Sequence, residues 1–323
     1  MRKFLLALLV LAFLATGSGI WWARQTWLQP GPLAEPTAVV IERGSGTQVV
    51  GTTLDERGVI RDPRVFAAAV WLTREQGPLR AGEYLFPAHA SLRQVLEVLR
   101  TARPVQRRVT LAEGLTARQM AAILQQAEGL VGDVPTIDEG ELLPETYAYT
   151  WGDSRASIVR RAATAMREVL EKLWKERAPG LPLETPREAV VLASIVERET
   201  ARPEERARVA AVFLNRLKRN MPLQSDPTVA YAASDGGVLD RPLTRADLEM
   251  DHPFNTYRSR GLPPGPIASP GIDSLRAVLQ PMDTDDLYFV ADGSGGHAFA
   301  RTLDEHNRNV ARWRALERQR SAP

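Results

Sequence analysis

One stretch near the middle of the chain constrains the fold most: Ala189 to Val196 is apolar at every position except Ser194. A helix that is apolar on all sides leaves no face for water, so other elements must surround it. Thr185, Pro186 and Glu188 form a helix-start signal of a capping residue, a proline at the first helical position and a glutamate that can reach back to the cap. The sequence therefore predicts a domain built around one buried helix.

The end of this helix carries two glutamates. Pro203 disfavours helical angles at Arg202, so we expect the helix to stop near Thr200. At helical spacing Glu197 lies on the face of buried positions, while Glu199 points roughly the opposite way. The pattern predicts that Glu197 is the inward carboxylate of the two.

The surroundings expected for Glu197 suit a general acid. Apolar neighbours and the carbonyl end of the helix both disfavour the anion, which would raise the pKa of this carboxyl. A partly protonated carboxyl can donate a proton in catalysis. Two alternatives remain open: Glu197 is only the first solvated residue after a buried helix, or a nearby arginine cancels the shift. The candidate arginines are Arg198, Arg202 and Arg206.

The amino-acid composition excludes several kinds of catalytic and binding site. The chain has 323 residues, which suits about two domains at ~100 to 200 residues each. Its 41 basic residues are scattered among 39 acidic ones, so nucleic acid is not an expected partner. There is no cysteine, the histidines lack metal-ligand spacing, and Ser194 lies in no nucleophile elbow. We expect no metal and no cofactor, and carboxylates remain as the acid and base groups.

The N-terminus predicts a membrane anchor. Arg2 and Lys3 precede Phe4–Ala23, which has no charge and is long enough to span the ~30 Å hydrocarbon layer. Trp21 and Trp22 fall where an aromatic belt would lie at the far interface. We expect a single-pass protein of the plasma membrane with a cytoplasmic N-terminus and the bulk of the chain outside. The alternative is a cleaved signal peptide.

The rest of the chain predicts an α+β protein. Strands and helices alternate in a small mixed α/β domain, and a larger α+β domain follows with an irregular, turn-rich segment at 221–282. A hairpin at 287–302 and a final helix at 303–316 close the chain. The expected divisions are a tail at 1–3, the transmembrane anchor at 4–23, a linker at 24–36, the small domain at 37–103, a connecting region at 104–152 and the larger domain at 153–323.

Several blocks resemble the YceG-like endolytic murein transglycosylases. The block Leu192–Thr200 is similar to the helix that bears the catalytic glutamate in that family. Further blocks follow in the family's order, and residues 37–103 resemble its LysM-like domain, so the resemblance covers nearly the whole chain. These blocks are 139–147, 212–217, 223–229, 254–257, 261–267, 288–297 and 305–307.

The resemblance implies an activity and a site. The substrate would be peptidoglycan glycan, cut between N-acetylmuramic acid and N-acetylglucosamine to leave 1,6-anhydro ends, with Glu197 as general acid and then base. It also implies a catalytic domain in the periplasm and contact with membrane-bound peptidoglycan synthases, the penicillin-binding proteins. The expected substrate-binding residues are Gln224, Asp226, Asn255, Tyr257, Tyr147 and Glu145, and the alternative for each is a hydrogen bond that fixes its loop.

Two other functions remain as alternatives. A non-catalytic glycan-binding scaffold for cell-wall synthases would bind glycan without cutting it. A hydrolytic muramidase would need a second carboxylate beside the general acid, because most glycosidases use a pair. Asp226 is the natural candidate for that second carboxylate.

Overall fold

The computed structural model describes residues 2–320 and divides into two compact units. The first holds residues up to 107 with short pieces at 129–131 and 148–153, and the second holds 108–128, 132–147 and the chain from 154 onward. The expected connecting region, 104–152, is therefore split between the two units. Met1 of the expected tail and residues 321–323 of the expected catalytic domain lie outside the described residues.

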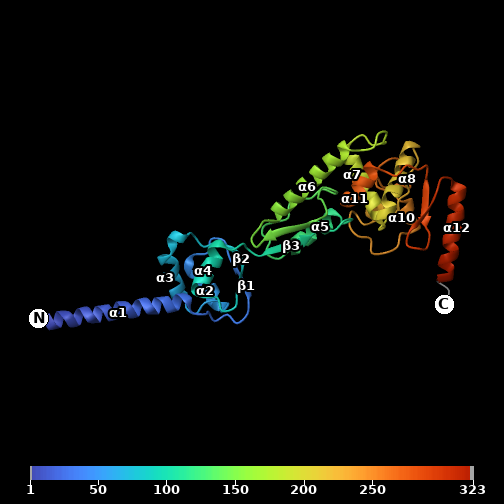
Figure 1. Cartoon of the computed structure of the whole chain (residues 1–323). Coiled ribbons are helices and arrows are strands. Elements are labelled where there is room, and N and C mark those ends of the chain that lie inside the picture. The colour runs from blue at the N-terminus through green and yellow to red at the C-terminus, as the bar shows by residue number, and fades with distance from the viewer. Residues whose placement is uncertain (1, 321–323) are drawn as a thin grey trace. The chain divides into compact units, whose positions relative to one another are not determined.

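The first unit begins with helix α1, Arg2–Leu28 (Figure 1). Phe4–Leu28 is long and apolar enough to cross a membrane, and it is the one such helix among residues 2–320. The helix continues beyond the predicted end at Ala23 because no proline or glycine interrupts the chain before Pro30. The start of the expected linker is therefore helical.

The remainder of the first unit has the elements that its sequence predicts. Strand β1 (Thr37–Ile41) pairs antiparallel with β2 (Gly82–Phe86), and Val39 lies opposite Tyr84. Between them lie α2 (Thr47–Glu56), α3 (Pro63–Leu72) and a short 3-10 turn η1 (Arg74–Gln76), and α4 (Leu92–Thr101) follows. One apolar core joins these elements, and its largest buried side chains include Leu54, Phe66, Tyr84, Phe86, Leu96 and Leu99.

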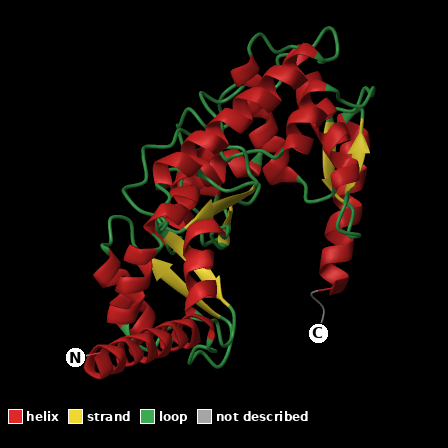
Figure 2. Cartoon of the chain, turned by 60° about the vertical axis from the view of Figure 1, so that its left-hand side comes forward, coloured by secondary structure: helices red, strands yellow, loops and turns green. Residues whose placement is uncertain are grey.

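A second strand pair precedes the large helices. Strand β3 (Gln106–Thr110) pairs with β4 (Thr146–Thr150), which the sequence did not predict because it follows a stretch without clear periodicity. Helix α5 (Ala117–Gln126) lies between them in the chain, and Thr116 is its N-cap. Strands in residues 2–320 occur only as separate pairs, as the yellow arrows in Figure 2 show.

Helices make up most of the regular secondary structure of the second unit. Helix α6 (Arg155–Lys175) leads to α7 (Pro186–Glu199), the helix expected to be central. The 3-10 turn η2 (Pro203–Glu205) then opens α8 (Arg206–Lys218). Helix α7 packs against α6, α8, α9 and α11, and every residue from Ala189 to Val196 is buried. The prediction of one enclosed helix is confirmed.

The segment 221–282 is more regular than its sequence suggests. It contains α9 (Asp226–Ala233), α10 (Arg245–Glu249) and α11 (Ile272–Leu279). Most of the segment is irregular as expected, and its short helices were missed because two turn signals are helix starts. Pro227 occupies the first turn of α9, and Gly271 is the N-cap of α11. Both helices are short, so their apolar periodicity extends over few positions.

The chain ends as predicted. Strands β5 (Tyr288–Ala291) and β6 (His297–Ala300) form an antiparallel hairpin, in which Phe289 lies opposite Phe299. Helix α12 (Leu303–Arg320) follows, four residues longer than the predicted 303–316. Phe289 and Phe299 pack on the core that also contains α7, so the hairpin covers one side of the second unit.

Candidate active site at the end of helix α7

Local sequence sets both ends of α7. The Thr185 side chain accepts a hydrogen bond from the Glu188 N–H, and the Glu188 carboxylate accepts one from the Thr185 N–H. This is the capping box that the sequence predicts, with Pro186 in the first turn. At the other end Thr200 takes extended angles, so Glu197 and Glu199 lie in the last turn.

Glu197 is held on both carboxylate oxygens. Its Oε2 accepts a 2.9 Å hydrogen bond from the Gly271 N–H at the start of α11, and its Oε1 accepts one of 3.3 Å from Arg206. Its side chain is only 5% exposed. The inward position predicted for Glu197 is therefore found, and of the three candidate arginines it is Arg206 that folds towards it.

Arg206 also lies close to two further carboxylates. Its guanidinium lies 3.5 Å from Glu113 and 3.7 Å from Asp273. Burial, followed by the charge of Glu197, raises the pKa of Glu113. Since Glu113 precedes α5 and Asp273 is in α11, this cluster ties the end of α7 to three other segments. The Glu197 side of the turn is thus a structural junction, formed by Glu197, Arg206, Glu113 and Asp273.

Glu199 lies in a different environment, which sequence reasoning missed. Its Oε1 accepts a short hydrogen bond of 2.5 Å from the Ser225 hydroxyl. Its pKa is raised to about 7, chiefly by burial and also by the charge of Asp226, while Ser225 and Arg216 oppose the shift. The residue nevertheless stays partly accessible to solvent. The view that only Glu197 looks inward was therefore wrong, because both sides of the last turn are covered.

Three of the predicted substrate-binding residues belong to this second environment. The Tyr257 hydroxyl donates a 2.6 Å hydrogen bond to Asp226 Oδ1. Burial, the bond to Asp226 and the charges of Asp226 and Glu199 all raise the pKa of Tyr257. Gln224 directly precedes Ser225 and has a left-handed backbone, with φ of 50°. Gln224, Asp226 and Tyr257 are thus brought together around Glu199 rather than Glu197.

Arg216 fixes the loop that faces Glu199. It is 7% exposed, and its guanidinium donates to the carbonyls of Leu287 at 2.7 Å and Leu223 at 2.8 Å. It also donates to Gln224 Oε1 at 3.4 Å. These bonds link α8 to the hairpin and to the loop that precedes α9. Arg216 is a site residue that the sequence analysis did not single out.

The chain matches the YceG-like family model over residues 39–312. It belongs to the YceG-like family. It is 31% identical to the endolytic murein transglycosylase of Bacillus subtilis strain 168, with 83% of this chain and 82% of that one covered. It is 30% identical to the endolytic murein transglycosylase of Streptococcus pneumoniae strain D39, over 84% of this chain and 57% of that longer one.

A solved YceG-like protein has a related structure. The crystal structure of the putative YceG-like protein lmo1499 from Listeria monocytogenes aligns with 85% of this chain at 28% identity and a TM-score of 0.50. The alignment covers 99% of the Listeria chain. The family resemblance inferred from the sequence blocks is therefore confirmed.

In this YceG-like chain Asn255 has a structural environment. It is fully buried, and its amide donates to the carbonyls of Leu248 at 3.0 Å and Met250 at 2.8 Å. Its Oδ1 accepts a hydrogen bond from the Tyr257 N–H. The full burial of its side chain favours the alternative to a direct sugar contact, which was a hydrogen bond that fixes its loop. Its bonds instead hold the loop that carries Tyr257.

The block 139–147 contributes differently from the expectation. Tyr147 is 8% exposed, and its hydroxyl donates to the Leu143 carbonyl at 2.7 Å. Glu145 is exposed and accepts a hydrogen bond from the neighbouring Thr146 N–H. The half-buried Glu139, which was not singled out, reaches Tyr231 of α9 at 3.3 Å, and burial raises its pKa. Glu139 is thus the residue of this block that touches the helix beginning with Asp226.

Proposed function

We propose that this YceG-like chain is a membrane-anchored lytic transglycosylase that cuts peptidoglycan glycan strands internally, with Glu199 as its acid and base. The observation that carries the proposal is the buried Glu199 carboxyl, whose pKa of about 7 leaves it partly protonated at neutral pH. The names of the relatives supply the substrate class. The cut would fall between N-acetylmuramic acid and N-acetylglucosamine.

The contacts of the two glutamates favour Glu199 over Glu197, the residue expected from the sequence. A sugar oxygen at Glu197 would have to compete with Arg206 and the Gly271 N–H, since each of these donors bonds one of its oxygens. Glu199 has one oxygen bonded to Ser225 and keeps some solvent access. In this proposal Glu197 holds the last turn in place and Glu199 transfers the proton.

The reaction needs one carboxyl group that acts twice. Glu199 in its protonated form gives its proton to the glycosidic oxygen as the bond to C1 of N-acetylmuramic acid breaks. The resulting carboxylate takes the proton from the C6 hydroxyl of the same sugar, and O6 bonds to C1 to close the 1,6-anhydro ring. The enzyme ends with its proton restored, and water is excluded from the step.

Asp226 and Tyr257 would support this cycle. The charge of Asp226 favours the protonated form of Glu199, and the Tyr257 hydroxyl holds Asp226. Gln224, presented by the loop that Arg216 fixes, would contact the sugar. We retain Tyr147 and Glu145 as more distant contributors, which would shape the segment that carries Glu139.

A second candidate function has one observation in its favour. Asp226 acts on the pKa of Glu199 through its charge, so a second carboxylate lies close to the proposed acid. Two carboxylates are what a hydrolytic muramidase uses to activate water. The scaffold alternative, in which synthases are positioned and no bond is cut, makes no use of the raised pKa of Glu199.

We propose that α1 anchors the enzyme in the bacterial inner membrane. Phe4–Leu28 has a mean hydropathy of 2.2 in its most apolar window, and none of that window is buried in the protein. Arg2 and Lys3 ahead of it favour a cytoplasmic N-terminus, with the rest of the first unit and the second unit in the periplasm. The first unit, with its LysM-like sequence, would bind glycan, and membrane-bound peptidoglycan synthases would be partners.

The products of cleavage test the proposed function. The full chain, in detergent, is incubated with un-crosslinked glycan strands beside Glu199→Gln, and products are identified by mass spectrometry. Anhydro-muramoyl ends made by the unmutated chain and not by Glu199→Gln are expected. Reducing ends, heavier by one water, would support the muramidase through Asp226, and intact strands in both samples with glycan still bound would support the scaffold.

A further inference from the structure

The end of helix α3 exposes large apolar side chains. Trp71 is 64% exposed and Leu72 is 71% exposed, whereas Phe66 and Ala69 on the other side of the helix are buried. Trp71 follows the exposed Ala68 at helical spacing, so the exposed residues share one face. Adjacent large apolar side chains in water are typical of an interaction surface.

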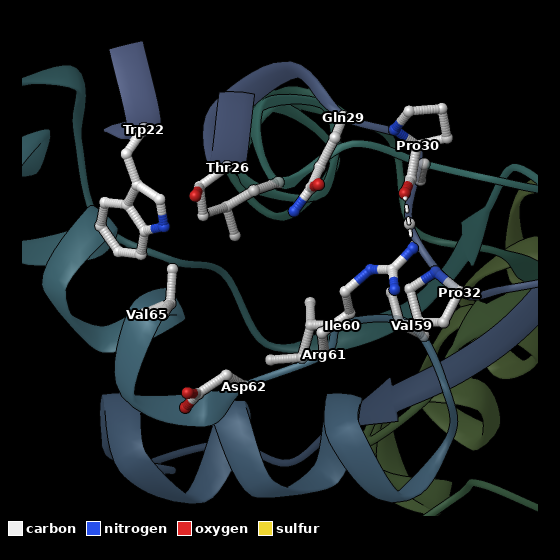
Figure 3. A pocket seen from close by; sticks show the side chains of 13 residues that line it. Trp22, Thr26, Gln29, Pro30, Pro32, Val59, Ile60, Arg61, Asp62 and Val65 are labelled. Carbon is white, nitrogen blue, oxygen red and sulfur yellow. Dashed lines mark hydrogen bonds between the residues drawn. The ribbon is translucent and has the colours of Figure 1, made fainter. Parts of the chain in front are cut away.

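The proposed anchor fixes where the membrane lies relative to this surface. The uncharged span from Phe4 ends at Trp21 and Trp22, the predicted interfacial belt. Trp22 of α1 and Val65 of α3 line the same cavity, which has a volume of about 230 Å³ (Figure 3). Asp62, the N-cap of α3, also lines it. Helix α3 therefore begins at the level along α1 where the hydrocarbon layer would end.

The direction of α3 keeps it at that level. In Figure 1, α3 runs crosswise to α1 within the first unit, on the side from which α1 enters. The buried side chains of α3, Phe66 and Ala69, belong to the core that α2 and α4 share. Its exposed face is consequently turned away from that core, and the start of α3 lines a cavity together with Trp22 and Thr26 of α1.

We propose that α3 lies in the headgroup boundary of the outer leaflet of this membrane, with Trp71 and Leu72 entering the outer acyl layer. The inference rests on the proposed membrane anchoring of α1. Its ligand is a phospholipid surface. The Arg74 guanidinium lies over the Trp71 ring, 5.0 Å from its centroid, where it can reach lipid phosphate while the indole contacts acyl chains.

The two membrane contacts would act together. With α1 alone, the first unit could tilt about the end of one helix. With α1 and α3 both held by lipid, the height and tilt of the first unit above the bilayer are fixed. The glycan-binding unit would therefore present its ligand at a constant distance from the membrane surface.

The absence of cysteine allows a direct test with the full chain. Leu72→Cys carries a polarity-sensitive fluorophore, and the protein is reconstituted in vesicles of phosphatidylethanolamine and phosphatidylglycerol with brominated acyl chains. The matched control is Leu85→Cys in β2, an exposed leucine with 57% exposure on another face of the unit. Leu14→Cys, within α1, reports on the anchor itself.

The expected result is a blue shift of the Leu72 label, quenching by the brominated chains and protection from aqueous iodide. The Leu85 label should show none of these. A Leu72 label that iodide quenches as strongly as the Leu85 label would overturn the proposal and leave the surface to a protein partner. If the Leu14 label is in lipid in that experiment, only α3 is refuted; if it is in water, the anchor fails as well.

Discussion

The two sides of the last turn of α7 carry the same side chain in opposite settings. On one side Glu197 meets an arginine and a helix N-terminus, and both of its oxygens are occupied. On the other side Glu199 meets a serine hydroxyl and the negative charge of Asp226. The difference shows that the segment packed against a carboxyl group, more than its place in the helix, decides whether it can release a proton at neutral pH.

The largest effect that separates the two sides is on the rate of cleavage. Glu199→Gln should lower the rate by about 10² to 10⁴, the usual contribution of an acid–base group, with a melting temperature no lower than that of the unmutated chain. Glu197→Gln is the matched control, because it alters the same helical turn by the same isosteric change. The rates are measured from initial product formation. If Glu197→Gln stays folded and loses as much activity as Glu199→Gln, the proposed difference between the two glutamates is contradicted.

The junction around Glu197 predicts a large effect on stability. Arg206→Ala leaves the nearly buried Glu197 beside Glu113 and Asp273 without its cation, so we expect a loss of about 3 kcal/mol in the free energy of unfolding. Arg276→Ala is the control. It breaks an ion pair to the same Asp273 in which both side chains are more than half exposed, and should cost about 1 kcal/mol or less. Equal losses in urea unfolding would contradict the proposed junction.

The Glu199 side predicts a dependence of stability on pH. Its folded pKa of about 7 lies above the ordinary value of 4.5, so the folded state binds the proton more tightly than the unfolded state. This contribution to stability is fully present below pH 4.5 and is lost as the pH rises through 7. Relative to Glu199→Gln, the unmutated chain should lose roughly 2 to 3 kcal/mol over that window. If the free energies of unfolding of the two chains change in parallel across this pH range, the raised pKa of Glu199 is refuted.

A smaller effect tests the loop that brings Tyr257 to Asp226. Asn255→Ala removes a buried amide and leaves the carbonyls of Leu248 and Met250 unpaired, at a cost of about 1 to 3 kcal/mol. A lower melting temperature is therefore expected, together with lower turnover. Reduced turnover with an unchanged melting temperature would instead restore Asn255 as a direct sugar contact.

Much of α7 could be predicted from its sequence because local signals define it. Thr185, Pro186 and Glu188 mark its start, an uninterrupted apolar run requires burial, and Pro203 accounts for its stop. The setting of Glu199 could not be predicted in the same way. It depends on Ser225, which is distant in sequence and is held in place by the bonds that Arg216 makes to the same loop.

The missed elements have a similar explanation. The proline and glycine signals between residues 221 and 282 suit turns and helix starts equally, and only packing against α7 and α8 shows that α11 is a helix. Strand β4 needs β3 as its partner. The family resemblance pointed to α7, and the proposed choice between its two glutamates rests on the contacts on each side.

The proposed reaction depends most on the protonation of Glu199, and the pKa of this group can be measured without substrate. Carboxyl carbon NMR of the chain with labelled glutamate, assigned by comparison with Glu199→Gln, would give the titration midpoint of this group. The account predicts a midpoint near 7. A midpoint at about 4.3, the ordinary value for glutamate, would contradict the assignment of Glu199 as the acid and base.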